Sequence, residues 1–274
     1  MEKTKDKTPL RFFAITFLWS WLFWGLGIFL GRENPLNIEN AAPGIGFISL
    51  LLGSFGPAVG AIISLYTIDG KDAVKKYLKS FFSLNFGLKV WLSIFLVLGL
   101  AGFIAWILPE FFGEDRLPSY LPGVYIFPLY LLIMIFFGGG QEEIGWRGYI
   151  SPYLEKRFGL ILGALILGII WAIWHIPLWF LPGASQSYMN FFGFTLLTIG
   201  YSYFFSWIIE ASGHRPMSGL IAHGTANAFA ALLPFLVMAH NSRQTRFWIY
   251  PVIILIIGII VVIVRTNKNR RSHE

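Results

Sequence analysis

The chain has 274 residues, of which 56% are hydrophobic and only 13% are charged. A soluble globular domain carries about 25% charged residues, so the composition excludes an ordinary soluble domain and indicates a polytopic membrane protein. The formal net charge is +7, but the basic residues cluster at the ends of apolar segments. That placement is typical of membrane topology and speaks against a nucleic-acid partner. The sequence has no cysteine, which excludes disulfides, thiolate metal sites and cysteine catalysis.

Eight apolar segments are long enough to be transmembrane helices. In chain order they are Leu10–Leu30, Gly44–Ile68, Val90–Phe111, Val124–Leu154, Leu160–Phe180, Phe191–Ile209, Met217–Ala239 and Phe247–Val264. The first segment follows basic residues, as a signal peptide would, but no small-residue cleavage site comes after it, so we expect a retained helix. The sequence therefore predicts an all-α, multi-pass helical bundle in the plasma membrane, with residues 1–274 as a single domain.

The distribution of Lys and Arg predicts the orientation of the bundle. With both termini in the cytosol, the cytosolic segments hold 16 of these residues and the outer loops hold four, including Arg32. This bias favours cytosolic termini, because cytosolic loops of membrane proteins are enriched in positive charge. The basic segment Lys71–Lys89 is interpreted as a cytosolic loop, with an amphipathic surface helix as the alternative.

The fourth segment carries an unusual polar string, in which Glu142, Glu143 and Arg147 follow the triple glycine Gly138–Gly140. One charged side chain at the bilayer centre costs at least about 2.5–3.5 kcal/mol. Glu143 and Arg147 are four residues apart and can pair on one helix face, whereas Glu142 points about 100° away from them. The glycines predict a break in the helix or a close approach of another chain segment. The alternative is a purely structural network of ion pairs.

Two later segments carry further polar side chains: His175 in the fifth, and His223 with Asn227 in the seventh. Pro177 weakens the helix after His175 and frees a backbone carbonyl group. His223 and Asn227 are one turn apart on a common face. Glu142 and His175 each lie 15 residues from the expected cytosolic ends of their helices, at a depth of roughly 22 Å. We therefore expect these groups to share one site.

Hydrolysis is the chemistry that suits this set. A carboxylate in an apolar cavity is a usable general base near neutral pH. We expect Glu142 to take a proton from water with the help of His175, and His223 and Asn227 to stabilise an oxyanion. Alternatively, Glu142, His175 and His223 hold Zn²⁺ with an open position for water. The spacing differs from His-Glu-x-x-His, so the sequence leaves the metal open.

The chain resembles the CPBP family, which contains the type II CAAX prenyl proteases, the Abi proteins and bacteriocin-processing enzymes. The three motifs of that family are Glu-Glu-x-x-x-Arg, Phe-x-x-x-His and His-x-x-x-Asn/Asp. They are matched in order by Glu142, Glu143 and Arg147, by Trp171 and His175, and by His223 and Asn227. Trp171 in place of Phe is the one departure, and we expect it to keep an aromatic packing role. The resemblance covers residues 44–239, the expected protease core.

The resemblance implies an intramembrane endopeptidase of metallo- or glutamate type. It implies Glu142 and His175 as the water-activating pair, His223 and Asn227 as oxyanion groups, and the pair of Glu143 with Arg147 as support. Its substrate would be a membrane-associated peptide in the lipid bilayer, either a prenylated CAAX-type C-terminus or a leader peptide. Two other functions remain open, a non-proteolytic immunity or sensor-regulating protein and a small-solute transporter. The sequence assigns no oligomeric state.

Overall fold

The computed structural model describes residues 8–30 and 44–271, and within these ranges the chain forms helices and no strand. The helices are α1 (Thr8–Leu30), α2 (Ile45–Ser54), α3 (Gly56–Lys79), α4 (Leu88–Ile107), α5 (Phe127–Phe136), α6 (Glu143–Gly145), α7 (Ser151–Trp174), α8 (Phe191–Ala211), α9 (Met217–Leu232) and α10 (Thr245–Arg271). The predicted all-α fold is therefore confirmed.

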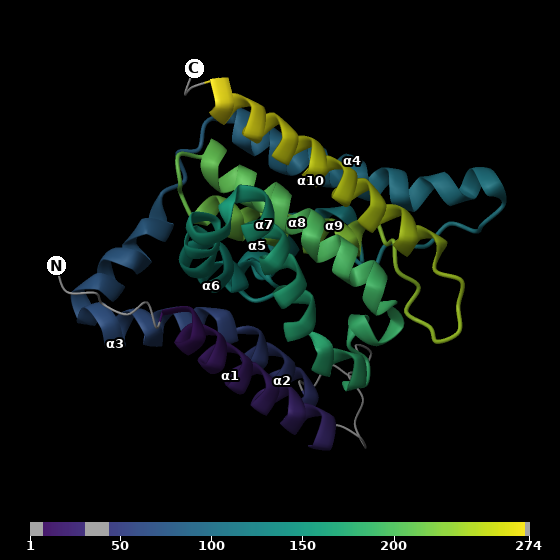
Figure 1. Cartoon of the computed structure of the whole chain (residues 1–274). Helices are drawn as coiled ribbons and strands as arrows, with labels where there is room; N and C mark the ends of the chain where they lie inside the picture. The colour runs from purple at the N-terminus through teal and green to yellow at the C-terminus, as the bar shows by residue number, and fades with distance from the viewer. Residues whose placement is uncertain (1–7, 31–43, 272–274) are drawn as a thin grey trace.

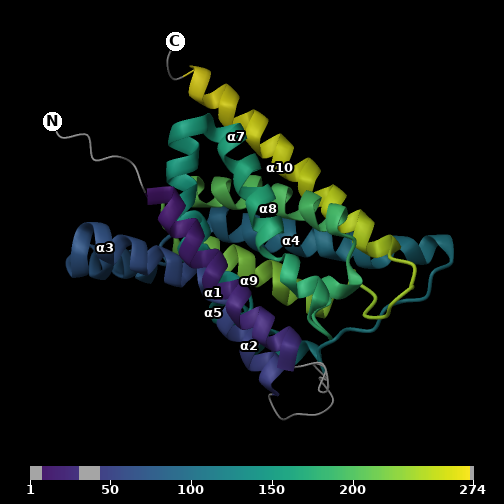
Figure 2. The same cartoon turned by 60° about the horizontal axis from the view of Figure 1, so that its bottom comes forward.

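The bundle has α9 in its interior, where α9 packs against α4, α5 and α8. Helices α1, α2 and α3 pack on one another and form one side of the molecule, while α10 lies along α8 and α4 on the other side (Figure 1). The beginning of α1 and the end of α10 lie toward the same side of the molecule in both views (Figures 1 and 2). The site described below lies between these two sides, where α6, α7, α8 and α9 meet.

Several helical segments of the described residues have the length and apolar character needed to cross a membrane. Five pass by themselves: Pro9–Leu30, Leu88–Phe112, Val124–Phe180, Phe191–Ala211 and Thr245–Asn267. Helices α2 and α3 together make a sixth, with a bend of 44° between them. The protein is thus a multi-pass membrane protein. The count of eight spans and the cytosolic termini stay predictions, and Arg32 and the N-terminal lysines lie outside the described residues.

The second predicted span is broken rather than continuous. Helix α2 ends at Ser54 and α3 begins at Gly56, followed by Pro57 in its first turn. Proline lacks a backbone N–H and is suited to the first turn of a helix, so the new helix begins there. Beyond a kink at Gly70, α3 continues to Lys79. The expected loop over 71–89 is therefore wrong for residues 71–79, which form a helix with an exposed basic face.

The fourth predicted span is also broken, at the triple glycine as expected. Helix α5 ends at Phe136, and Gly139 has a φ angle of +119°, which a residue with a side chain rarely adopts. Close approach accompanies this break, because a Cβ placed on Gly224 of α9 would lie 2.6 Å from the Cα atom of Ile135. In addition, α9 ends at Leu232 and not at Ala239.

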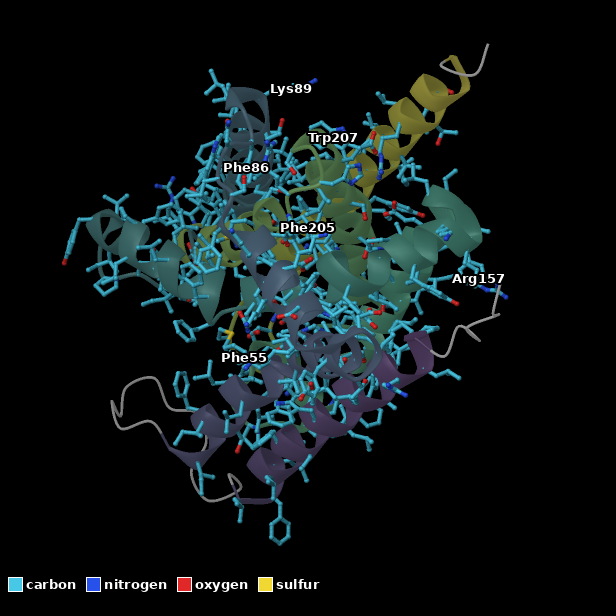
Figure 3. The ribbon with its side chains drawn as sticks, turned by 90° about the vertical axis from the view of Figure 1, so that its left-hand side faces the viewer. Phe55, Phe86, Lys89, Arg157, Phe205 and Trp207 are labelled. Atoms are coloured by element: carbon cyan, nitrogen blue, oxygen red, sulfur yellow. The ribbon has the colours of Figure 1, made fainter. Side chains whose placement is uncertain are left out.

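Large aromatic side chains fill the centre of the bundle. Trp146, Trp171, Trp174 and Phe205 are all buried. Figure 3 shows Phe205 in the middle of the molecule, whereas Arg157 lies at its periphery. The polar groups of the site are therefore surrounded by aromatic rings.

Candidate active site

A short irregular segment presents the two adjacent carboxylates. After Gly139 the chain forms a 3₁₀ turn over Gly140–Glu142, and α6 begins at Glu143. The side chain of Gln141 braces this turn: its Oε1 accepts a hydrogen bond from the backbone N–H of Gly139 at 2.9 Å, and its Nε2 donates to Oγ of Ser54 at 2.9 Å. The end of α2 thus holds the glycine break in place.

Glu143 belongs to a buried ion-pair cluster. Its Oε1 accepts hydrogen bonds from Nη1 of Arg147 and from Nδ1 of His223, each at 2.9 Å. Arg147 also donates to Oγ of Ser202 on α8 at 3.1 Å. The pairing of Glu143 with Arg147 predicted from their spacing is present, and it joins α6, α8 and α9.

The guanidinium of Arg147 lies between two aromatic rings. Its Cζ atom is 4.5 Å from the ring centre of Trp171 and 5.2 Å from that of Phe205. A guanidinium over the face of an aromatic ring is attracted by the ring quadrupole, and this attraction increases when water is excluded. The rings therefore contribute to holding a charged group in the interior of the bundle.

Glu142 has a different environment from that of Glu143. Its Oε2 accepts a hydrogen bond from the indole Nε1–H of Trp171 at 2.8 Å. Glu142 as a whole is only 5% exposed. The ion pairs of the described residues include Glu143 but not Glu142. The carboxylate of Glu142 is therefore oriented by a neutral donor and not by a cation.

His175 follows the last residue of α7, where Pro177 prevents the helix from continuing. Its Nδ1 lies 2.8 Å from the backbone carbonyl oxygen of Trp171. A carbonyl oxygen only accepts hydrogen bonds, so Nδ1 must carry the hydrogen, and Nε2 of a neutral ring has the free lone pair. This contact fixes the tautomer of His175, whose ring contacts those of Trp24, Trp174 and Phe194.

His223 and Asn227 converge on the glycine break. Nδ2 of Asn227 donates to the carbonyl oxygen of Gly138 at 2.6 Å. A Cβ placed on Gly139 would lie 2.5 Å from Nδ2 of Asn227 and 2.6 Å from Nε2 of His223. Only glycine leaves both nitrogen atoms uncovered at this point.

The structure brings six of the seven predicted site residues into one contact network, with Trp171 between Glu142, Arg147, His175 and His223. The seventh, Asn227, contacts the adjoining glycine break at Gly138. Their catalytic roles stay predictions. Three residues of the network carried no predicted role. Gln141 was visible in the polar string, whereas neither Ser202 on α8 nor Tyr77, which donates to the carbonyl oxygen of Ile144, had any signal in the sequence.

The side chains present do not form a ready metal site. Within the described ranges, no group of three or more His, Asp or Glu side chains is arranged to hold a metal ion. The Nδ1 atoms of both histidines are engaged with other partners, as described above. Zn²⁺ stays a prediction from the sequence, and no chemical step below depends on it.

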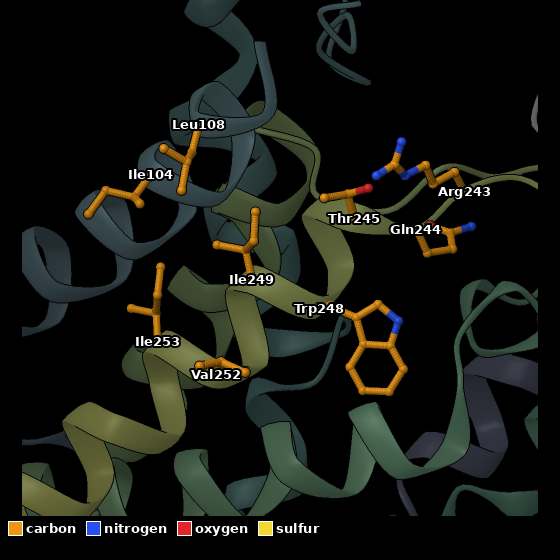
Figure 4. Close-up of a pocket in the computed structure, with 9 residues that line it drawn as sticks. All are labelled: Ile104, Leu108, Arg243, Gln244, Thr245, Trp248, Ile249, Val252 and Ile253. Carbon is orange, nitrogen blue, oxygen red and sulfur yellow. The ribbon is translucent and has the colours of Figure 1, made fainter. Parts of the chain in front are cut away.

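Two surface grooves lie away from the polar network. The larger has a volume of about 680 Å³ and lies between α4 and α10, where Ile104, Leu108 and Trp248 are part of its lining (Figure 4). The smaller, of about 360 Å³, is lined by residues including Tyr188 and His240. Neither groove includes a residue of the polar network.

Comparison with known proteins supports the motif assignment. Residues 124–229 match the family model described as type II CAAX prenyl endopeptidase Rce1-like, and this segment contains all three motifs. The CAAX prenyl protease 2 of Methanococcus maripaludis is 25% identical over 182 residues, which cover 65% of this chain and 65% of the relative's own length. Both matches are to type II CAAX prenyl proteases, and they support the resemblance to the CPBP family recognised from the motifs.

Proposed function

We propose that the protein is an intramembrane endopeptidase in which Glu142 activates water. The observation that carries this proposal is the difference between the two adjacent carboxylates. Glu143 is neutralised by Arg147, whereas Glu142 receives a hydrogen bond from the neutral indole of Trp171. A carboxylate without an ion-pair partner, in a water-poor site, retains the basicity that proton abstraction requires.

The proposed reaction begins when Glu142 takes a proton from a water molecule. The resulting hydroxide oxygen forms a bond to the carbonyl carbon of the scissile peptide, and the carbonyl oxygen becomes an oxyanion. The C–N bond then breaks, and the leaving amine takes the proton that Glu142 holds. His175 hydrogen-bonds the water through the lone pair of Nε2, which its contact with the carbonyl of Trp171 keeps free.

The oxyanion would be stabilised in the space beside Gly139. Nδ2 of Asn227 and Nε2 of His223 converge there. Donation through Nε2 requires a doubly protonated His223, and the carboxylate of Glu143, which also pairs with Arg147, accepts the hydrogen of Nδ1. Hydrogen-bond donors preorganised around a developing negative charge are among the largest contributions to catalysis.

The location of the site and the name of the curated relative support a substrate class. A buried site among membrane-spanning helices receives peptides that are themselves anchored in the bilayer. The curated relative is called CAAX prenyl protease 2, which supports a C-terminal peptide of a prenylated or otherwise lipid-anchored protein. We place the enzyme in the plasma membrane, where leader peptides are the second candidate class.

Cleavage of a panel of lipid-anchored reporter peptides by purified protein in vesicles tests the proposal. Wild-type protein should cleave at least one reporter, and Glu142→Ala should abolish turnover with unchanged membrane insertion. Glu110→Gln, at the ion pair with Arg116, is the matched control and should keep full activity. Full turnover by Glu142→Ala would overturn the proposal.

Metal analysis of the purified protein and inhibition by chelators decide whether Zn²⁺ takes part.

A further inference from the structure

Trp171 lies at the centre of the polar network. Its indole Nε1–H donates to Glu142, its ring face lies against Arg147, and its backbone carbonyl accepts from the ring of His175. Its ring is also 5.1 Å from that of His223 in an edge-to-face arrangement. One residue therefore contacts a member of each of the three sequence motifs.

The hydrogen bond of Trp171 differs from those of other tryptophans in the described part of the chain. Five other indole N–H groups donate to backbone carbonyl oxygens: those of Trp19, Trp21, Trp24, Trp106 and Trp179. The indole of Trp171 donates to a carboxylate. Such a bond to a charged acceptor is stronger than one between neutral groups. Packing alone, the role expected from the sequence, does not require it.

The donor is held in a fixed direction. Trp171 is almost completely buried, and the rings of Tyr201 and Phe205 pack against its indole. The guanidinium of Arg147 over its face further restricts rotation. An indole fixed in this way determines where Oε2 of Glu142 lies. A phenylalanine, which is the family's residue at this position of the motif, has the ring but no hydrogen to donate.

We propose that Trp171 is a positioning residue that uses its indole N–H to hold Glu142 in the orientation needed for attack on water. This rests on the proposed function of Glu142 as the general base. Oε2 is restrained by the hydrogen bond, and Oε1 is the oxygen that takes the proton. A neutral donor suits this task, because it orients the carboxylate without forming the ion pair that Arg147 forms with Glu143.

The kinetic test compares Trp171→Phe with Trp174→Phe. Trp174 is also buried, its ring packs against that of His175, and its Nε1 has no hydrogen-bond partner among the described residues. Its variant therefore controls for the loss of indole volume beside the site. We expect Trp171→Phe to lower kcat by about 10- to 100-fold with little change in KM, the usual size of a hydrogen bond to a charged group. Trp174→Phe should keep kcat within about threefold. Equal effects of the two variants would overturn the proposal.

A spectroscopic test does not depend on activity. The chain has 11 tryptophans, and Trp171→Phe identifies the indole N–H signal of Trp171 in protein labelled with ¹⁵N-tryptophan. Glu142→Gln, which keeps the shape but removes the charge, should shift this signal and leave that of Trp174 in place. An unmoved signal would overturn the hydrogen bond even if the enzyme cleaves its reporter. A shifted signal without reporter cleavage would support the contact and count against the proposed function alone.

Discussion

Two neighbouring buried carboxylates, those of Glu142 and Glu143, have different surroundings. The cluster around Glu143 contains a cation, an imidazole and a hydroxyl group, and it connects three helices. The cluster around Glu142 contains an indole N–H and the nearby ring of His175, which is fixed by a backbone carbonyl. In the first cluster a cation balances the charge of the carboxylate. In the second a neutral hydrogen-bond donor orients the carboxylate, and no cation pairs with it.

This difference separates a structural role from a chemical one. A buried carboxylate that is paired with arginine gains its stability from the pair and is a poor proton acceptor. A buried carboxylate without a cation retains its basicity, and the fold must tolerate the cost of burying it. The predictions below test each half of this division, from the largest expected effect to the smallest.

Removing the cation from the Glu143 cluster should have the largest effect on stability. Arg147→Met leaves the carboxylate of Glu143 buried without its ionic partner, and we expect a loss of about 3–5 kcal/mol in the free energy of unfolding. Denaturation in mixed detergent micelles measures this loss. The double variant Glu143→Leu with Arg147→Met should recover most of it, because no unpaired charge remains. A double variant as unstable as the single one would contradict the structural role.

Changing the imidazole of the Glu142 cluster should affect turnover and not folding. His175→Gln removes the Nε2 lone pair, and we expect kcat to fall at least about 10²-fold, the usual size of an acid–base contribution. The midpoint of thermal unfolding should move little. His240→Gln, at an exposed histidine whose ring packs against that of Tyr188, is the control and should keep wild-type kcat. If both histidine variants lose activity equally, the role of His175 fails.

The glycine break links the two clusters, and a side chain there should disturb both. Gly139→Ala forces a side chain into a φ of +119° and against His223 and Asn227. We expect the backbone strain to lower the free energy of unfolding by about 1–3 kcal/mol. In addition, the displaced side chains should lower kcat by more than about tenfold. Gly70→Ala is the matched control. Gly70 also has a positive φ, of +80°, but its Cβ would meet no atom within 4 Å. Similar activity losses in both variants would attribute the effect to backbone strain alone.

The smallest effect should come from the outer edge of the Glu143 cluster. Ser202→Ala removes one hydrogen bond to Arg147, for which we expect a loss of about 1–2 kcal/mol of stability and nearly unchanged kcat. Ser206→Ala, one helical turn later, removes a buried hydroxyl that has no partner among the described residues, and it should be neutral. Greater destabilisation by Ser206→Ala would show that the contact of Ser202 with Arg147 contributes little.

The sequence predicted the parts of this site that depend on local spacing. The four-residue separation of Glu143 and Arg147 predicted their pair, and the triple glycine predicted the break before Glu142. Both follow from helix geometry and from the properties of single residue types. Pro177 likewise predicted the weakened helix after His175, where α7 has ended.

Contacts between distant segments were not accessible from the sequence. Ser202 lies on another helix and belongs to no motif, so nothing marked it as a partner of Arg147. The hydrogen bond from Trp171 to Glu142 depends on how α7 is rotated against α6, which periodicity in a uniformly apolar helix does not fix. The helix over residues 71–79 was only the second interpretation of its segment, because its lysines resemble a solvated loop as much as an amphipathic surface.

The burial of the site has a consequence for the lipids around it. The commonest hydrolysable bonds near a membrane protein are the ester bonds of its own bilayer, and they are chemically easier to cleave than a peptide bond. Glu142, His175 and His223 are only 5%, 6% and 5% exposed, so an ester bond of a surrounding lipid does not lie against the proposed site. The burial of the site would thus protect membrane lipids from cleavage, before any side chain recognises a substrate.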